Sequence, residues 1–287
     1  MSNSATMRFS WNLRSQSKEG HGLIVSILPA IILATVCGCQ EPGGRALTLV
    51  SWNVRHCEAG VDAVAAELRS VGPDVICLQE TKSGRWTPDG IHQGERIAEQ
   101  LGMRQLSSDE ELVEDHEEQA SLLYRGELRN TELLKAGNGR AYGVTTVIDW
   151  EGVPIRVVCL HLTDNSLADP VWFLRTGWHR LREVADLGRR LNRWKGEIIV
   201  AGDFNAIPGM PEHLIMASRL LWVPFIHPTH PTALPLLCLD HVYHTRGLHV
   251  GSLEIRSSSA SDHLMVVARV QVRVGSQETG HKPENGE

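Results

Sequence analysis

Short, uninterrupted apolar runs recur along this chain, and several of them end at polar residues. Val-Ile-Cys-Leu at 75–78 is followed by Gln-Glu, and Ile-Ile-Val-Ala at 198–201 is followed by Gly-Asp-Phe-Asn. A continuous apolar run of this length, bounded by polar residues, is typical of a β-strand that is buried on both faces. Such strands need other layers of structure on each side, which favours a layered fold.

Helical and strand patterns are mixed along the rest of the sequence. Apolar residues at helical spacing predict helices over 61–71, 95–101 and 174–194. Further strands are predicted over 47–52, 121–124, 143–150, 155–160, 239–244 and 263–274, with a hairpin turn at Glu151-Gly152. The proline-containing segment 207–237 is predicted to be irregular. Because hairpins occur among the helices, the pattern favours an α/β sandwich over a purely parallel, doubly wound sheet.

Length and charge limit the possible classes of protein. A chain of 287 residues, 42% hydrophobic and 22% charged, is ordinary for one soluble domain of about 200–250 residues with short ends. Global disorder and a polytopic membrane protein are disfavoured. The formal net charge is −6, and an acidic body does not attract polyanions. This weakens the case for a tight, sequence-independent DNA binder, although a bound metal ion can still create a local anion site.

The N-terminus resembles an export signal. Basic residues precede an uncharged apolar stretch over 23–36, which ends in Val-Cys-Gly-Cys at 36–39 and resembles the lipobox of bacterial lipoproteins. This predicts a signal peptide over 1–39, lipid attachment at Cys39, a tether over 40–46 and a periplasmic or cell-surface protein anchored to the membrane. An ordinary cleaved signal or an uncleaved anchor helix are the alternatives. The polar tail over 275–287 is predicted to be disordered.

The remaining cysteines do not form a recognisable disulfide framework. Cys57, Cys77, Cys159 and Cys238 have spacings typical of no known disulfide pattern, and two of them lie inside apolar runs. We therefore expect small, buried hydrophobic side chains at these positions.

Polar side chains with catalytic chemistry follow or flank most of the predicted strands. Strand ends are rigid supports from which such side chains can converge on one cleft. One Glu or His at such a position is ordinary, because it can simply cap a strand in solvent. The candidates form a larger set, namely Asn53, Glu80, His161, Asp203, Asn205, Asp240, Asp262 and His263. The number of such residues favours a shared active site.

The order of these motifs resembles one known family. Ser-Trp-Asn-Val, Ile-Cys-Leu-Gln-Glu, Cys-Leu-His-Leu, Ala-Gly-Asp-Phe-Asn, Leu-Asp-His-Val and Ser-Asp-His look like the motifs of the DNase I-like endonuclease/exonuclease/phosphatase family. The resemblance covers residues 47–274, the predicted domain. It implies a four-layer α/β sandwich in which two packed mixed β-sheets are flanked by helices. It also implies a divalent-metal-dependent hydrolase that acts on phosphoester bonds through a metal-activated water.

A divalent cation suits this reaction because a phosphodiester repels nucleophiles and has a poor leaving oxygen. Mg²⁺ prefers oxygen ligands and few protein carboxylates. By resemblance, Glu80 is the main ligand of Mg²⁺ or Mn²⁺ and Asn53 assists it. Asp262 contributes through water or a second ion.

The resemblance also assigns the catalytic steps. Asp203 orients or deprotonates the attacking water, and Asn205 binds the developing oxyanion. His263 contacts the phosphate, Asp240 orients His263, and His161 donates to a phosphate oxygen. An Asp240–His263 hydrolase dyad is an alternative interpretation, but no Gly-x-Ser-x-Gly motif accompanies it.

Several other residues are weaker candidates for the site. Arg55 and His56 follow the Asn53 motif directly and are candidates to line the cleft, and Arg140 is a candidate to reach an anionic substrate. His227 and His230, with Asp240, suggest zinc, but their spacing fits no usual zinc signature.

The motifs define the reaction and leave the substrate open. The favoured hypothesis is a phosphodiesterase or phosphatase acting on an envelope or extracellular phosphoester, such as a phospholipid head group or a sugar or inositol phosphate. The alternative is a secreted or surface-attached nuclease that contacts DNA or RNA through arginines at 189, 190 and 193. A repair-type apurinic endonuclease is less favoured, because His161 replaces the tyrosine that those enzymes carry. A catalytically silent binding module is a third hypothesis. We expect the domain to be a monomer.

Overall fold

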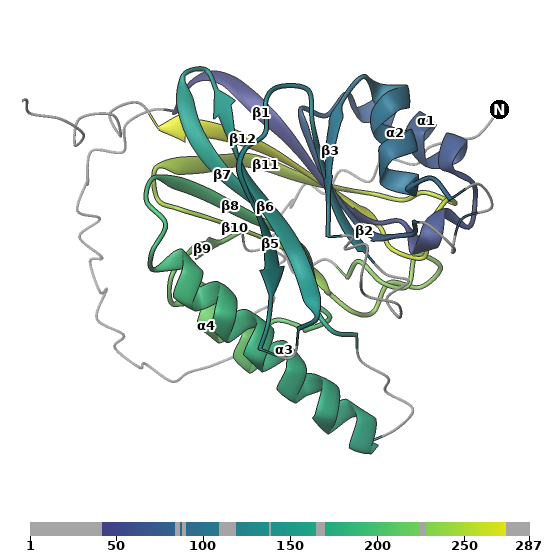
Figure 1. The fold of residues 1–287 in the computed structure, drawn as a ribbon, viewed down its shortest axis with the longest axis vertical. Coiled ribbons are helices and arrows are strands. Elements are labelled where there is room, and N and C mark those ends of the chain that lie inside the picture. Colours follow the sequence, from purple (N-terminus) through teal and green to yellow (C-terminus); the bar gives the residue numbers. More distant parts are fainter. Residues whose placement is uncertain are drawn as a thin grey trace, which may run out of the picture.

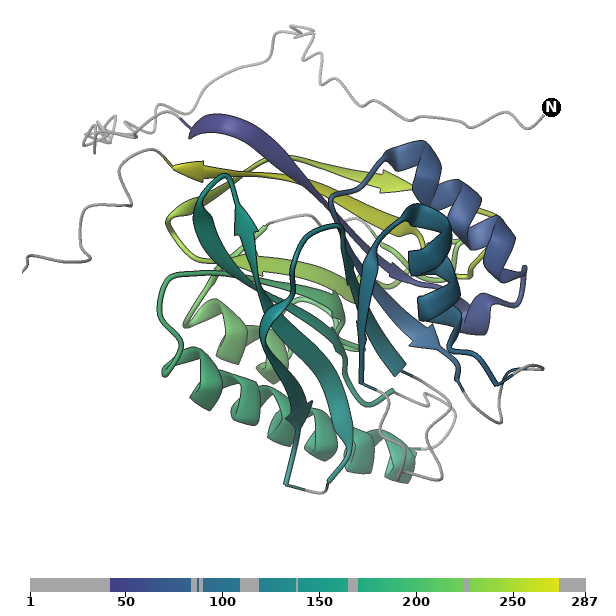
Figure 2. The same ribbon diagram turned by 45° about the horizontal axis from the view of Figure 1, so that its top comes forward.

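The computed structural model describes residues 42–83, 87, 90–108, 119–137, 139–164, 170–223 and 228–273. Within these ranges the strands form two six-stranded sheets that pack face to face, with helices on both outer sides (Figures 1 and 2). This confirms the four-layer α/β sandwich that the family resemblance implies. Cys39 with the predicted signal peptide, the acidic stretch 109–118, His227 and the tail over 275–287 lie outside the described residues.

The first sheet has the order β11-β12-β1-β2-β4-β3. Its strands are β11 (Leu248–Arg256), β12 (Met265–Arg273), β1 (Pro42–Asn53), β2 (Val75–Thr81), β4 (Gln119–Tyr124) and β3 (Arg104–Ser107). Strands β1 and β2 are parallel, whereas β12 is antiparallel to β1. The helices that cover this sheet are α1 (Val61–Val71) and α2 (Gln93–Leu101).

The second sheet has the order β5-β6-β7-β8-β10-β9. Its strands are β5 (Arg129–Lys135), β6 (Ala141–Trp150), β7 (Val153–His161), β8 (Glu197–Asp203), β10 (Asp240–His244) and β9 (Leu221–Trp222). Strands β7 and β8 are parallel, and β10 is antiparallel to β8. The helices that cover this sheet are α3 (Pro170–Leu191) and α4 (Pro211–Ala217).

Three apolar clusters hold the layers together. The central cluster joins the facing sides of the sheets and contains Cys77 and Cys159. A second cluster packs α1 and α2 on the first sheet, through residues such as Leu68 and Ile97. A third packs α3 and α4 on the second sheet, through residues such as Leu187 and Met216. Burial of apolar surface on every sheet face explains why the central strands read as continuous apolar runs.

Strand β1 begins earlier than the strand predicted at 47–52, so part of the tether expected over 40–46 belongs to the first sheet. Arg45 fixes this segment to the domain. Its backbone N–H donates to the Glu151 carboxylate at 3.0 and 3.2 Å, and its guanidinium lies 4.7 Å from the ring centre of Trp150.

The segment 207–237, predicted to be irregular, contains the short helix α4 and strand β9. Pro211 is the first residue of α4, a position where the missing N–H and fixed φ of proline are compatible with a helix. All four cysteines that the structure describes are buried, as predicted, and none of these four forms a disulfide. No described helix is long and apolar enough to cross a membrane.

Candidate active site

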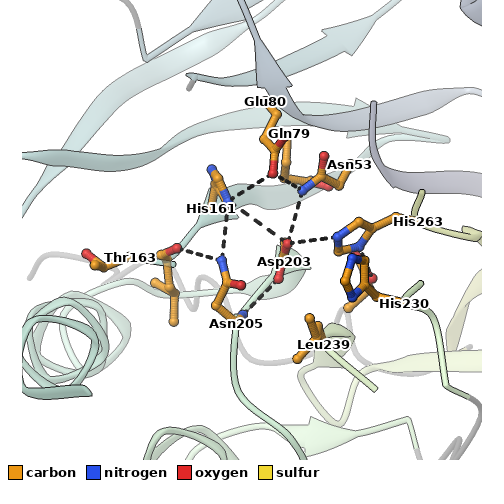
Figure 3. A network of polar contacts seen from close by, with 12 residues as sticks. Asn53, Gln79, Glu80, His161, Thr163, Asp203, Asn205, His230, Leu239 and His263 are labelled. Atoms are coloured by element: carbon orange, nitrogen blue, oxygen red, sulfur yellow. Dashed lines mark hydrogen bonds and ion pairs between the residues drawn. The ribbon is translucent and has the colours of Figure 1, made fainter. Parts of the chain in front are cut away.

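Strand directions bring the predicted residues to one end of the sandwich. Asn53 ends β1 and Glu80 lies near the end of the parallel strand β2, while His161 and Asp203 end the parallel strands β7 and β8. Because β10 is antiparallel to β8, its first residue, Asp240, pairs with Asp203. Strand β12 is antiparallel to β1, so the loop that carries His263 reaches the same end. Figure 3 shows side chains from both sheets meeting there.

Asn53 connects the two sheets at the centre of the site. Its Nδ2 donates to Glu80 Oε1 at 2.7 Å and to Asp203 Oδ2 at 3.1 Å (Figure 3). Its Oδ1 accepts the backbone N–H of Arg55 at 3.0 Å. The Ser261 hydroxyl donates to the Asn53 carbonyl at 2.6 Å. One buried amide therefore places two carboxylates from different sheets side by side.

A local irregularity in β2 aims Glu80 into the site. Glu80 has a φ of 56°, and the register of β2 against β4 shifts between Leu78 and Thr81. A bulge of this kind redirects a side chain that would otherwise alternate with its neighbours. The left-handed backbone costs about 1–3 kcal/mol for a residue other than glycine, and such strain is found at functional sites more than elsewhere.

Each position of Gly-Asp-Phe-Asn has a local structural reason. A Cβ on Gly202, whose φ is 153°, would collide with the Leu160 carbonyl oxygen of β7. Phe204 is buried, and its backbone N–H donates to the Leu239 carbonyl at 2.9 Å. Asn205 has a φ of 47°, and its backbone N–H donates to Asp203 Oδ1 at 2.8 Å. The chain therefore turns back at the end of β8 and presents Asp203 and Asn205 to the same space.

Asn205 lies beside His161. Its Nδ2 donates to the Leu162 carbonyl at 3.0 Å and lies 3.4 Å from His161 Nε2. His161 Nε2 is also 3.9 Å from Glu80 Oε1 and 4.0 Å from Asp203 Oδ2. Burial lowers the pKa of His161 to about 4, against the opposing effect of Asp203. His161 is therefore a neutral imidazole at neutral pH.

His263 is held by a buried carboxylate. Its Nδ1 donates to Asp240 Oδ2 at 3.0 Å, and its Nε2 lies 3.8 Å from Asp203 Oδ2. Burial alone would lower the pKa of His263, but Asp240, Asp203 and Asp262 together raise it to about 10. The imidazole is therefore positively charged in the ion-free site.

Ser261 and Trp52, which precede the catalytic residues of their motifs, support the position of His263. Ser261 Oγ accepts the backbone N–H of His263 at 3.1 Å while donating to the Asn53 carbonyl. The indole N–H of Trp52, fully buried, donates to the His263 carbonyl at 3.1 Å. Hydrogen bonds of Trp52 and Ser261 therefore join the Ser-Trp-Asn and Ser-Asp-His motifs to each other. The residues beside the catalytic ones thus hold the two motifs in place.

The structure groups Asp262 with basic residues. Asp262 Oδ2 lies 3.7 Å from His230 Nε2 and 3.6 Å from Arg55 Nε. Burial would raise the pKa of Asp262, but His230, His263 and Arg55 lower it overall. Three overlapping groups of potential ligand atoms each lie within 4.8 Å of one another. They are Glu80 with His161 and Asp203, Asp203 with Asp240 and His263, and His230 with Asp262 and His263.

The sequence pattern gave weak signals for two further residues that reach the site. His56 Nε2 lies 3.7 Å from Glu80 Oε2, because residues 55–57 form a left-handed turn with φ values of 44–55° directly after β1. His230 stands in a proline-rich loop, and its ring centre is 4.5 Å from that of His263. In the sequence, only the closeness of His56 to Asn53 suggests that it reaches the site. The residues around His230 do not distinguish it from an ordinary histidine in a loop.

Arg140 and the arginines of α3 have protein partners. Arg140 donates to the Thr163 hydroxyl at 2.7 Å, and the same hydroxyl donates to Glu183 at 2.6 Å. Arg189 and Arg190 both pair with Asp186, at 3.1 and 2.8 Å. Arg190 also pairs with Glu132 at 3.2 Å, so two carboxylates balance Arg189 and Arg190 and weaken the case for a nucleic-acid surface at this end of α3.

The donor set fits a divalent cation with oxygen ligands. The carboxylates of Glu80 and Asp203 accept hydrogen bonds from a single amide group, so two negative charges lie close together in a partly buried place. Such a pair favours a bound cation. Asn53 turns its Nδ2 toward both carboxylates, so its amide would have to rotate by half a turn for Oδ1 to act as a ligand.

Together, the fold and the site define an α/β protein of the DNase I-like class. The sequence profile of the Endonuclease/Exonuclease/phosphatase family matches residues 50–263. The chain therefore belongs to this family, whose members are typically metal-dependent phosphoester hydrolases. No curated protein matches the chain significantly in sequence.

Solved structures share the fold at low sequence identity. The catalytic domain of human Nocturnin with bound sulfate superimposes with a TM-score of 0.61 at 17% identity, over 81% of this chain and 96% of that one. A family member from Beutenbergia cavernae DSM 12333 gives 0.60 at 19% identity, over 80% and 72%. A 3′ phosphatase from Neisseria bound to a product DNA hairpin gives 0.58 at 14% identity, over 78% and 98%.

Proposed function

We propose that this protein is a divalent-metal-dependent phosphoester hydrolase. The observation that carries the proposal is the meeting of Asn53, Glu80, His161, Asp203 and Asn205 at one end of the sandwich, with contacts of 2.7–4.0 Å. Glu80, with a rotated Asn53 amide, would hold Mg²⁺ or Mn²⁺. The ion supplies charge neutralisation at the phosphate and stabilisation of the leaving oxygen.

The separations around Asp203 suit a bridging water or phosphate oxygen. Asp203 Oδ2 lies 3.8 Å from His263 Nε2 and 4.0 Å from His161 Nε2. These distances exceed direct hydrogen bonds of about 2.7–3.2 Å, so an oxygen placed between the groups would contact both. In the proposed reaction, Asp203 accepts the proton of the attacking water and Asn205 Nδ2 donates to the developing oxyanion.

The two histidines would act differently on a phosphate. His263, whose charge is stabilised by Asp240, would pair with a phosphate oxygen through Nε2. His161, neutral because of its burial, would donate through Nε2 without adding charge. The tetrahedral sulfate in the Nocturnin structure is consistent with an anion site in this fold.

The proposed substrate is an envelope or extracellular phosphoester. Support comes from the export-type N-terminus, with its proposed lipid attachment at Cys39, and from the acidic net charge of −6. The pairing of Arg189 and Arg190 with Asp186 further disfavours the alternative, a surface-attached nuclease.

A substrate panel tests this proposal. The purified chain would be incubated with Mg²⁺ or Mn²⁺ and plasmid DNA, RNA, sphingomyelin, phosphatidylinositol or bis-p-nitrophenyl phosphate. We expect turnover of the small diester and of a phospholipid or inositol phosphoester. Cleavage of nucleic acid alone would support the nuclease, and no turnover with either metal would support a binding module.

A further inference from the structure

His241 follows Asp240 directly in Leu-Asp-His-Val, and neither the family resemblance nor the proposed reaction gives it a role. It is the second residue of β10 and pairs with Gly202 of β8, just before residues 203–206, which we call the catalytic turn. Its side chain is only 1% exposed, so it does not reach a substrate. A polar side chain buried this deeply beside an active site calls for a specific hydrogen-bonding role.

The imidazole of His241 holds the last residue of the catalytic turn. Its Nε2 lies 2.9 Å from the Ala206 carbonyl oxygen, and because a carbonyl only accepts, Nε2 carries the proton and donates. Ala206 is itself buried, so solvent does not readily replace this hydrogen bond. Burial lowers the pKa of His241 to about 4, so at neutral pH the ring is uncharged and has one N–H, which is directed at Ala206.

The same ring packs against the aromatic residue within the catalytic turn. Phe204 is buried and meets His241 edge to face, with ring centres 5.4 Å apart and planes at 75°. Phe204 also packs against Tyr243, two residues further along β10, with ring centres 5.2 Å apart. His241 therefore contacts the turn at Phe204 and at Ala206, which are the two neighbours of Asn205.

Helix α4 helps to fix the orientation of His241. The ring centre of His213 on α4 lies 5.4 Å from that of His241, and the Tyr243 hydroxyl lies 2.6 Å from His213 Nδ1. His241 and Tyr243 point to the same face of β10, because side chains alternate along a strand. The position of the imidazole is therefore set by packing outside the site, which is how a precise site is held in place.

Asn205 depends on the conformation that His241 supports. Its φ of 47° is left-handed, and a residue other than glycine keeps such a backbone only where the surrounding structure enforces it. In this conformation its Nδ2 donates to the Leu162 carbonyl at 3.0 Å and lies 3.4 Å from His161 Nε2. Without the bond to Ala206, Asn205 would relax toward an ordinary backbone conformation and move its Nδ2 away from His161.

We propose that His241 is a positioning residue, whose hydrogen bond to the Ala206 carbonyl keeps the Asn205 amide directed at the developing oxyanion. The effect on catalysis rests on the proposed function, whereas the effect on the conformation of Asn205 does not. A catalytic group displaced by about 1 Å can cost about a hundredfold in rate. Because Asn205 acts on charge that develops during the reaction, its displacement should lower kcat more than it raises KM.

Substitutions at His241 separate the hydrogen bond from the packing. His241→Gln keeps an N–H donor without the ring, His241→Phe keeps a ring without a donor, and His241→Leu is a smaller variant that also lacks a donor. We expect kcat for bis-p-nitrophenyl phosphate to fall about tenfold to a hundredfold in the Phe and Leu variants, with KM within about twofold. His241→Gln should stay within about threefold of wild type, because its donor rescues the turn. His249→Phe, on β11 of the other sheet, is the matched control and should behave like wild type.

Nuclear magnetic resonance tests the conformation of Asn205 without turnover. Labelling of asparagine with ¹⁵N reports its backbone and side-chain amides, and their loss in Asn205→Asp assigns them. We expect His241→Gln to keep the wild-type Asn205 signals, with side-chain protons protected by the Leu162 carbonyl. His241→Phe and His241→Leu should shift both signals and speed the exchange of the side-chain protons.

Two results would overturn the positioning role. One is unchanged kcat and unchanged Asn205 signals in the Phe and Leu variants, with circular dichroism showing that they are folded. The other is an equal loss in His241→Gln and His241→Phe, which would assign the effect to ring shape and not to the hydrogen bond. A wild type without turnover would contradict the proposed function, and the Asn205 signals would then decide the role of His241.

Discussion

At the scale of single residues, His161 and His263 face the same carboxylate, Asp203 (Figure 3), but one imidazole is neutral and the other is charged. Burial dominates at His161 and lowers its pKa to about 4. At His263 the same effect of burial is outweighed by Asp240, Asp203 and Asp262, which raise the pKa to about 10. The site thus offers a phosphate one neutral and one charged donor, and the second depends on Asp240.

Burial of a neutral histidine also predicts how stability depends on pH at His241, which lies outside the proposed metal site. His241 is buried, its Nε2 donates to the Ala206 carbonyl at 2.9 Å, and burial lowers its pKa to about 4. An unfolded histidine titrates near 6.5, so between about pH 6.5 and 4 the unfolded chain binds a proton that the folded chain does not. Stability should therefore fall as the pH drops through this window.

Urea unfolding at pH 7 and pH 4.5 would measure this effect. His241→Gln, which keeps a donor for Ala206, should reduce the loss of stability at pH 4.5 by about 2 kcal/mol. His249→Gln on β11 serves as the control and should behave like wild type. If His241→Gln loses as much stability as wild type between the two pH values, burial of a neutral His241 is not the cause.

Most of the site residues could be predicted because each belongs to a short motif at the end of an apolar strand. His56 and His230 could not be assigned in this way. The approach of His56 to Glu80 depends on the left-handed turn at 55–57. His230 is placed beside Asp262 by the tertiary hydrogen bonds of Thr229 and Thr232 and by its own backbone pairing with Leu237. Neither arrangement leaves a periodic pattern in the sequence.

At the scale of elements, the strands that sequence pattern did not predict are all sheet edges. Strands β3 and β11 are the edges of the first sheet, and β5 and β9 are those of the second. An edge strand has one unpaired side and often little burial, so its side chains need not be apolar. The first three residues of β5, at 129–131, are exposed. The central strands are buried on both faces, so their side chains are apolar in continuous runs that the sequence shows directly.

Gly202 tests the link between β8 and the catalytic turn. Alanine at this position would place a methyl group against the Leu160 carbonyl of β7 and is strained at a φ of 153°. We expect Gly202→Ala to destabilise the fold by about 2–3 kcal/mol in urea unfolding. Gly196→Ala is the matched control, since φ is 84° and no atom lies within 4 Å. Gly196→Ala should lower the free energy of unfolding by about 1 kcal/mol. Equal losses in the two variants would contradict the collision at Gly202.

The contact between α3 and α4 contains a fully buried ion pair. Arg180 Nε donates to Glu212 Oε1 at 2.9 Å, and Arg180 NH1 donates to the Thr163 carbonyl at 3.2 Å. Arg180→Met leaves the Glu212 carboxylate buried without its partner and should cost about 3–5 kcal/mol in chemical denaturation. The double variant Arg180→Met with Glu212→Leu should recover most of that loss. A double variant no more stable than the single one would contradict this account.

At the scale of the whole molecule, fold and site are contained in one sandwich, while the proposed location depends on the N-terminal segment. Arg45 ties the start of β1 to the β6–β7 hairpin through Glu151. Only a short segment therefore separates Cys39 from the folded domain, which would hold the domain close to a membrane surface. The site residues support the proposed reaction, and the N-terminal segment supports the proposed location near envelope substrates.

The lipid anchor can be tested by membrane fractionation. Cys39→Ala should move the protein from the membrane fraction to the soluble fraction, because it removes the proposed site of acylation. Cys57→Ala, at a buried free cysteine, serves as a control and should remain with the membrane. Membrane retention of the Cys39 variant would contradict the lipobox assignment.

The most direct test of the central claim is metal-dependent hydrolysis of bis-p-nitrophenyl phosphate by the purified chain. We predict turnover with Mg²⁺ or Mn²⁺, its loss on chelation, and a loss of at least about a hundredfold in Glu80→Ala and in Asp203→Ala. Glu99→Gln, on the exposed face of α2, is the control and should retain full activity. Activity that survives chelation, or that persists in either of the two site variants with the fold intact, would contradict the proposed hydrolase.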